Sequence, residues 1–257
     1  MPISKNGTPI ATLEDWEQFA GPMRDDQWVD GRSAKETARA WLEGDGVDLP
    51  KEVATLLKRH DAFGRLLSWS AEPEGPLRFD DLAGEPRPFD LLVQATDEQG
   101  DYLIAVDGTV DEPFGDTVGD TLAAAVDGER PDGVARVTQL VTALLGARQE
   151  GDPALKDIRY QLVAACAGAL GEAGRRGHPR VLVLVHEFVT DRAQDRKLLV
   201  NAIDLGRFVK RLSHGAATSL DAGELHGPFA VPGAPLLAAP IDLFIGKVSR
   251  NMRSRRG

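Results

Sequence analysis

Two short apolar runs near the middle of the chain carry the strongest structural signal in the sequence. The run from Leu91 to Ala95 follows Asp90, and the run from Tyr102 to Val106 precedes Asp107. The turn-forming residues between them read Asp-Glu-Gln-Gly-Asp. Apolar runs joined by a short glycine-containing loop are typical of an antiparallel hairpin. The pattern therefore predicts a hairpin within the stretch from Phe89 to Gly115.

Helical spacing of apolar residues predicts several helices around this hairpin. We expect helices at residues 14–20, 34–42, from Pro50 onward, 134–147, 154–173 and 194–212. Residues 117–126 fit either a helix or irregular structure. The nearly uninterrupted apolar run from Val181 to Phe188 is typical of a buried parallel strand that follows a crossover helix.

Three segments lack such a pattern. Residues 1–13 are expected to form a poorly ordered arm, and residues 70–88, rich in Pro, Gly and acids, a surface loop. Residues 215–248 look loop-rich, although they contain the apolar run from Ile241 to Ile245. The pattern predicts an α/β fold with a mixed sheet flanked by helices. We divide it into a helical region (1–70), a core (71–215) and an extension with a basic tail (216–257).

Composition and charge narrow the function classes. The net charge of −10 argues against a surface built mainly to hold phosphate backbones. The arginines of the tail (Arg250, Arg253, Arg255 and Arg256) are expected to be disordered and solubilising. The single cysteine, Cys166, excludes an intramolecular disulfide and is expected in the core. No apolar run is long enough to span a membrane and no signal peptide is evident, so a cytoplasmic location is expected.

The hairpin predicts that two carboxylates meet. Because a hairpin places the start of one strand beside the end of the next, Asp90 and Asp107 are expected to be neighbours. Two adjacent carboxylates repel each other unless a cation lies between them, and a divalent cation with oxygen ligands meets that need. The alternative is that Asp107 simply ends a strand in solvent, because Asp-Gly is a common turn pair. Nearby Glu112 is expected to be exposed.

The order of elements and the acids at the hairpin resemble the PD-(D/E)XK nuclease superfamily over roughly residues 33–188. The runs GRSAKETARAWL, VDGTVDEPFG and IRYQLVAA resemble an uncharacterised bacterial branch of it. The resemblance implies a core of one helix, three antiparallel strands, a crossover helix and a further strand. It also implies Mg²⁺- or Mn²⁺-dependent hydrolysis of phosphodiester bonds, with DNA or RNA as the partner.

The same resemblance implies roles for individual residues. Asp90 and Asp107 stand where the two metal-binding acids stand, and the carbonyl of Gly108 would help to bind the metal. Thr109 stands where the superfamily has a lysine, so the charge that stabilises the transition state is missing there. Glu36 could match an extra acid on the first helix, although its spacing from Ser33 also fits a capping box.

Further residues follow from the crossover helix and from the missing lysine. Relatives keep a Gln or Tyr that faces the site, which implies such a role for Gln161, with Arg159 and Tyr160 beside it. Lys247, Arg159 and Lys35 are candidates to replace the lysine.

Other motifs are incomplete. The stretch from Gly31 to Thr37 lacks the spacing of a phosphate-binding loop, and no nucleophile-elbow motif is present. His186-Glu187 is not followed by a second His at zinc-protease spacing, so His186 is expected to be a core residue at a strand end. Three hypotheses remain: a weak or conditional nuclease, an inactive nuclease fold that binds or supports a partner, and an unrelated α/β enzyme. The oligomeric state stays open.

Overall fold

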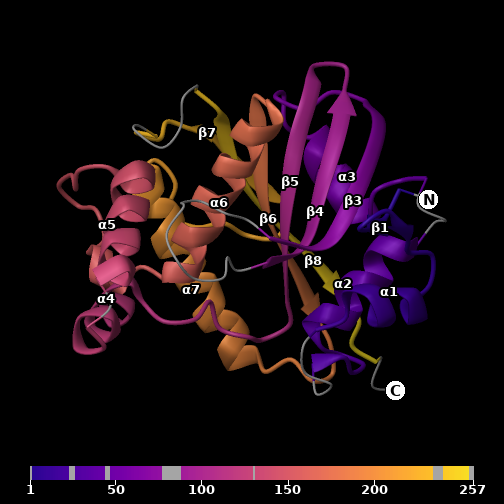
Figure 1. Cartoon of the computed structure of the whole chain (residues 1–257), viewed down its shortest axis with the longest axis horizontal. Coiled ribbons are helices and arrows are strands. Elements are labelled where there is room, and N and C mark those ends of the chain that lie inside the picture. Colours follow the sequence, from indigo (N-terminus) through magenta and orange to yellow (C-terminus); the bar gives the residue numbers. More distant parts are fainter. Residues whose placement is uncertain are drawn as a thin grey trace.

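A mixed six-stranded sheet lies between two groups of helices in the computed structural model, which describes residues 2–22, 27–43, 47–76, 88–129, 131–233 and 240–254 (Figure 1). The spatial order of the strands is β3 (Leu66–Pro76), β4 (Pro88–Asp97), β5 (Gly100–Thr109), β6 (Arg180–Val189), β8 (Asp242–Asn251) and β7 (Glu224–Phe229). Strands β5, β6 and β8 are parallel, and the other pairs are antiparallel. The sheet is therefore parallel at its centre and antiparallel at both edges.

Each face of the sheet has its own hydrophobic core, because side chains alternate along a strand. One core packs against α1 (Leu13–Ala20), α2 (Ser33–Leu42) and α3 (Lys51–Lys58). The opposite core packs against α4 (Val118–Asp127), α5 (Pro131–Leu145), α6 (Tyr160–Arg176) and α7 (Asp195–Leu212). Alternate residues of the parallel strands belong to alternate cores, so a two-residue step along β5, β6 or β8 stays on one face.

The central predictions are confirmed. Strands β4 and β5 form the antiparallel hairpin, with Leu91 opposite Val106. Strand β6 is buried and lies between two parallel neighbours, as the apolar run predicts. Cys166 lies in the core under α6, and His186 is fully buried. The crossover helix begins later than expected, at Tyr160, because a short 3₁₀ turn (Leu155–Asp157) precedes it. None of the helices in the described ranges is long and apolar enough to cross a bilayer.

The N-terminal prediction is wrong. Residues Ser4–Lys5 (β1) and Thr8–Pro9 (β2) form a small antiparallel hairpin that buries Ile3 and Ile10. Its turn, Asn6-Gly7, has positive φ at both residues (50° and 80°), which Asn and Gly tolerate best. The Asn-Gly pair is the hairpin signal that the sequence offered at this point.

Two segments that were expected to be loops contain strands. Residues 70–76 belong to β3, an edge strand, where prolines are tolerated because they remove no interior ladder bond; residues 77–87 lie outside the described ranges. The segment expected to be loop-rich supplies β7 and β8, and β8 is an interior strand with six consecutive buried residues. Arg250 lies in β8 and Arg253 bonds to Asp195, so neither belongs to a disordered tail; Arg255 and Arg256 lie outside the described residues.

Candidate functional site

Asp90 and Asp107 lie where β4 begins and β5 ends, at neighbouring positions of the hairpin. The last pair in the ladder is Leu91 with Val106, so Asp90 and Asp107 are the next two residues outward on facing strands. The Asp90 carboxylate accepts a hydrogen bond of 2.6 Å from the backbone N–H of Gly108, the residue after Asp107. The hairpin thus places Asp90, Asp107 and the Gly108 backbone at one end of the ladder.

Helix α6 reaches the same point from one face of the sheet. The Gln161 side chain, in the first turn of α6, donates a hydrogen bond of 3.1 Å to the Asp107 carboxylate. The backbone N–H of Tyr160 binds the carbonyl of Asp116, which anchors the start of α6 to the chain that leaves β5. Of the residues expected on this helix, the Gln161 side chain contacts an acid of the site and Arg159 does not.

Helix α2 reaches Gly108 from the opposite face, through Thr37. The Thr37 hydroxyl is buried and has no hydrogen-bond partner among the described residues. A Cβ atom at position 108 would lie 2.0 Å from this hydroxyl and 3.4 Å from an Asp90 oxygen. Only glycine fits between them, so the close packing of α2 on β5 explains the residue at 108. The sequence carried no signal that singled out Thr37.

Glu36 has a different role from the one that a capping box predicts. Helix α2 begins at Ser33, and its N-cap residue is Arg32. The Glu36 carboxylate is buried and accepts hydrogen bonds of 2.7 Å each from the Gly31 backbone and from Arg39. The Ser33 hydroxyl instead donates to Glu112. The capping-box interpretation is therefore wrong, and Glu36 holds the loop before α2 in place.

A second group of polar side chains continues along the α6-side face of the sheet. Thr109 stands two residues after Asp107 on β5, and its register partner on β6 is Glu187. Glu187 forms an ion pair of 2.8 Å with Lys247 of β8, and both residues are more than nine-tenths buried. Glu187 was not among the predicted site residues, although it stands at the carboxyl end of a buried parallel strand, where ligands commonly bind.

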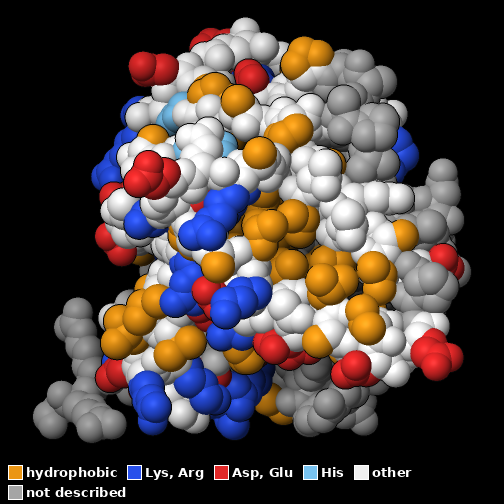
Figure 2. Space-filling model, turned by 90° about the vertical axis from the view of Figure 1, so that its left-hand side faces the viewer, with side chains coloured by type: hydrophobic (Ala, Val, Ile, Leu, Met, Phe, Trp, Pro, Cys, Tyr) orange, Lys and Arg blue, Asp and Glu red, His pale blue; other side chains and the backbone are white. Residues whose placement is uncertain are grey.

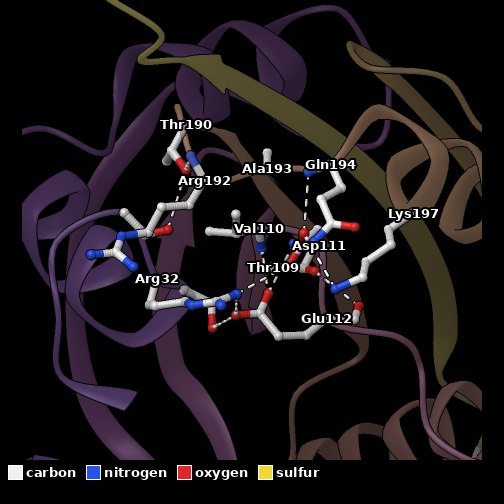
Figure 3. Close-up of polar contacts among 12 residues, drawn as sticks. Arg32, Thr109, Val110, Asp111, Glu112, Thr190, Arg192, Ala193, Gln194 and Lys197 are labelled. Carbon is white, nitrogen blue, oxygen red and sulfur yellow. Dashed lines mark hydrogen bonds and ion pairs between the residues drawn. The ribbon is translucent and has the colours of Figure 1, made fainter. Parts of the chain in front are cut away.

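A buried carboxylate organises the loops beyond this edge (Figure 3). Asp111, 2% exposed, accepts a hydrogen bond of 3.1 Å from Arg32 and another of 3.1 Å from the Gln194 backbone, and it lies 3.6 Å from the Lys197 ammonium group. Asp111 therefore links the start of α2 to the start of α7.

Glu112 was expected to be exposed, but it is half-buried and hydrogen-bonded. Its carboxylate accepts hydrogen bonds from the backbone N–H groups of Val110 (2.6 Å) and Asp111 (3.1 Å). Its carbonyl accepts a bond of 2.8 Å from the Asn201 side chain of α7. Glu112 thus closes the turn that follows β5.

Basic side chains gather on the side of the molecule that α4, α5 and α7 form, despite the negative net charge (Figure 2). Arg159, just before α6, and Arg207, on α7, both bind the buried carboxylate of Asp204, at 2.7 and 3.1 Å. Arg159 is 24% exposed and Arg207 38% exposed, so both guanidinium groups can still contact a ligand in solvent. Lys35, in the first turn of α2, forms an ion pair of 2.8 Å with Asp30, which lies on the exposed loop before the helix.

The donor set at the hairpin suits magnesium or manganese. It comprises two carboxylates and the Gly108 backbone, and no His or Cys of the described ranges joins them in a metal-binding group. Among the described residues, no group of three or more His, Cys, Asp or Glu side chains could hold a metal by itself. Mg²⁺ commonly binds through one or two carboxylates and keeps several waters, whereas structural zinc takes four protein ligands. The residues present therefore fit a hydrated Mg²⁺ or Mn²⁺ and do not fit a structural zinc.

Nearly the whole chain, with all the site residues described above, matches one family model. Residues 9–252 match the model of a domain of unknown function, DUF6946. No curated protein and no solved structure matches the chain. Because the match covers nearly the full length of the chain, the protein belongs to the DUF6946 family.

Proposed function

We propose that this protein is a metal-dependent hydrolase of the phosphodiester bonds of nucleic acid, related to the PD-(D/E)XK nucleases. One observation carries the proposal: Asp90 and Asp107 occupy the two positions next to the last ladder pair of the hairpin, and the Asp90 carboxylate accepts a hydrogen bond from the Gly108 backbone. The order of elements supports it, since α2, three antiparallel strands, α6 and the parallel β6 occur in this order, with α3 inserted after α2 and α4 and α5 inserted after β5.

The residues of the site would divide the work as follows. Asp90, Asp107 and the Gly108 carbonyl would hold the metal, which when bound supplies a water of lowered pKa and positive charge for the phosphate. Gln161 keeps the Asp107 carboxylate oriented through their hydrogen bond. In the reaction, water attacks phosphorus and a P–O ester bond breaks, which leaves a phosphate on one product and a hydroxyl on the other.

The substrate class follows from charge. Arg159 and Arg207 lie close to the start of α6, and Lys197 and Arg32 lie at the Asp111 loop beside the same edge. Basic side chains around an acidic site can neutralise a phosphate backbone while the site itself attracts a metal. The protein would act in the cytoplasm, where nucleic acid is the abundant polyanion.

A second candidate function is an inactive nuclease fold that binds or supports a partner. Thr109 favours it, because the threonine hydroxyl carries no charge and is directed to the Glu112 carbonyl at 3.4 Å. Removal of one preorganised electrostatic group lowers a rate by about 10²- to 10³-fold. A slow enzyme and an inactive fold are therefore the two outcomes to separate.

Cleavage assays in Mn²⁺ with single- and double-stranded DNA and RNA separate them. We expect Thr109→Lys to raise the cleavage rate, because it adds positive charge two residues after Asp107, and Asp107→Asn to abolish cleavage. Asp101→Asn is the matched control, since Asp101 is an exposed acid at the opposite end of β5. If neither the parent nor Thr109→Lys cleaves any substrate, the hydrolase proposal is wrong and the binding role is favoured.

A further inference from the structure

A buried ion pair lies on the same face of the sheet as the candidate site. The Lys247 ammonium group is 2.8 Å from the Glu187 carboxylate, and their side chains are 9% and 11% exposed. Neither residue has a role in the metal site proposed above. Because an apolar pair at such positions is often at least as stable as a buried ion pair, stability alone does not explain the two charges.

The strand registers place this pair next to the site. Asp107 pairs with Val185 on β6, and Val185 pairs with Lys247 on β8. Lys247 is thus level with Asp107, two strand spacings or about 10 Å away. Glu187, the register partner of Thr109, stands on β6, which lies between β5 and β8. Its ion pair with Lys247 therefore holds the lysine ammonium group on the side of β8 that faces β5.

Side-chain alternation puts all four residues on one face. Asp107 contacts Gln161 of α6, which fixes its side of the sheet. Thr109 stands two residues further along the same strand. Val185 and Ile245 belong to the core under α6 and α7, so Glu187 and Lys247, two residues beyond them, face the same way.

The other two candidate cations lie outside the central strands, Lys35 in α2 and Arg159 at the N-cap of α6. Lys35 pairs with Asp30, an acid whose side chain is 71% exposed on the loop before α2. Arg159 binds Asp204 and the carbonyl of Gly115, both at 2.7 Å. Lys247 alone of the three stands in a strand that is in register with Asp107.

We infer that Lys247 supplies, from β8, the positive charge that Thr109 does not, and that Glu187 positions the lysine until a phosphate group binds. This inference rests on the proposed function. A lysine is a compact cation on a flexible four-carbon chain, so its ammonium group can turn from a carboxylate to a phosphate oxygen. The role of the motif lysine thus passes to another strand of the same sheet.

The test is an NMR titration of the full chain with Mg²⁺, followed by inorganic phosphate. We expect the parent to bind both ions, with shifts at the amides of Gly108 and Thr109. Lys247→Met should keep Mg²⁺ binding and weaken phosphate binding by about ten- to a hundredfold, because it removes one charge-assisted hydrogen bond. Adding Thr109→Lys to Lys247→Met should restore phosphate affinity, since the charge returns at the neighbouring strand.

Two further variants keep the test decisive. The double variant Lys247→Met with Glu187→Gln leaves no uncompensated buried charge, so it should fold even where the single variant does not. Arg180→Met is the matched control: it breaks a buried ion pair with Asp97 (2.8 Å) at the opposite end of β6 and should leave phosphate affinity unchanged.

The outcomes separate the inference from the proposed function. Equal phosphate affinity of the parent and the Lys247 variants, with Mg²⁺ bound by both, overturns the inference and leaves the hydrolase proposal standing. A parent that binds Mg²⁺ but no phosphate also overturns the inference. A parent that binds no Mg²⁺ overturns the hydrolase proposal and, with it, the role of Lys247.

Discussion

Gly108 links the proposed metal site to the packing of α2 on the sheet. The Thr37 hydroxyl lies where a side chain at 108 would begin, and Asp90 bonds the Gly108 backbone on the same strand edge. Any side chain at 108 would have to displace the Thr37 hydroxyl and would crowd the Asp90 carboxylate. The identity of this one residue therefore matters for both stability and the site.

We expect Gly108→Ala to lower the free energy of unfolding by about 1–3 kcal/mol, the usual cost of overpacking. Adding Thr37→Ala should recover most of that loss, because it removes the atom with which the new Cβ collides. Urea unfolding curves measure both variants. Gly174→Ala, within α6, is the control. A Cβ atom there would lie 3.5 Å from the Ile241 side chain, an ordinary contact distance, so this variant should be neutral or slightly stabilising. Additive effects of the 108 and 37 substitutions would contradict this account.

Glu52 provides a test of electrostatics at the residue scale. Burial raises the pKa of the Glu52 carboxyl, but hydrogen bonds with His186 (2.9 Å) and Arg250 (2.7 Å) outweigh it and lower the pKa to about 2. Burial lowers the pKa of His186, so its ring is neutral at neutral pH.

A depressed carboxyl pKa stabilises the folded state above the unfolded-state value and loses that contribution as pH falls through the folded-state value. We therefore expect the stability that Glu52 contributes to disappear between about pH 4.5 and pH 2. Unfolding free energies measured across this range should fall less steeply in Glu52→Gln than in the parent. Glu17→Gln, an exposed residue of α1, should follow the parent curve. Parallel curves for Glu52→Gln and the parent would refute the role of this carboxylate.

At the element scale, Asp111 decides where α7 begins. Its carboxylate accepts the N–H of Gln194, the N-cap residue of α7, and also binds Arg32 from the start of α2. Two elements that are more than 150 residues apart in the sequence therefore share one buried acid.

We expect Asp111→Ala to destabilise the protein by about 1–3 kcal/mol, since charged hydrogen-bond partners lose their acceptor. Hydrogen exchange should speed up at the first turn of α7 and at the start of α2, whereas β6 should keep its protection. Asp195→Ala, in the same turn of α7 but exposed, should leave exchange at the start of α2 unchanged. Uniformly faster exchange over the whole sheet would show that Asp111 supports the global fold and not these two elements.

Elements with a strong local pattern were predictable, and those that depend on distant partners were not. Residues 181–188 are apolar throughout, so β6 could be recognised without knowledge of its neighbours. Strand β8 follows a stretch rich in proline and glycine, and its interior position comes from pairing with β6, which no local pattern encodes. Strand β3 contains Pro73 and Pro76, which an edge strand tolerates but which hide it in the sequence.

The same distinction holds for the candidate site. Asp90 and Asp107 could be paired because a hairpin relates them through a short turn. Glu187 and Lys247 join the same face only through two parallel pairings that span 140 residues of sequence, from Asp107 to Lys247. Thr37 could not be found at all, since its role arises from the packing of a helix on a strand.

At the scale of the whole molecule, charge is unevenly distributed. The chain carries a net charge of −10, yet arginines and lysines concentrate on the side formed by α4, α5 and α7 (Figure 2), and Arg32 and Lys197 lie beside Asp111. An acidic protein with a local basic region holds polyanions weakly except at that region. This distribution suits the proposed function, in which basic side chains around the site would bind the phosphates of the substrate.

We expect the nucleic acid affinity of the parent to fall as salt rises, and we expect the double variant Arg159→Gln with Arg207→Gln to bind more weakly with a shallower salt dependence. Fluorescence anisotropy with a labelled oligonucleotide in Ca²⁺ at several salt concentrations measures both. The exposed pair Arg65→Gln with Arg175→Gln, away from this region, is the control for net charge. Equal losses in the two double variants would assign binding to overall charge alone.

The central claim, that Asp90 and Asp107 hold a divalent cation, is tested most directly by paramagnetic broadening with Mn²⁺. In ¹H–¹⁵N spectra of the parent, substoichiometric Mn²⁺ should broaden the amide signals of Gly108 and Thr109 and spare Gly100, at the opposite end of β5. Asp107→Asn should abolish this selective broadening, and Asp101→Asn should leave it unchanged. Broadening that is equal at both ends of β5, or that persists in Asp107→Asn, would contradict the claim.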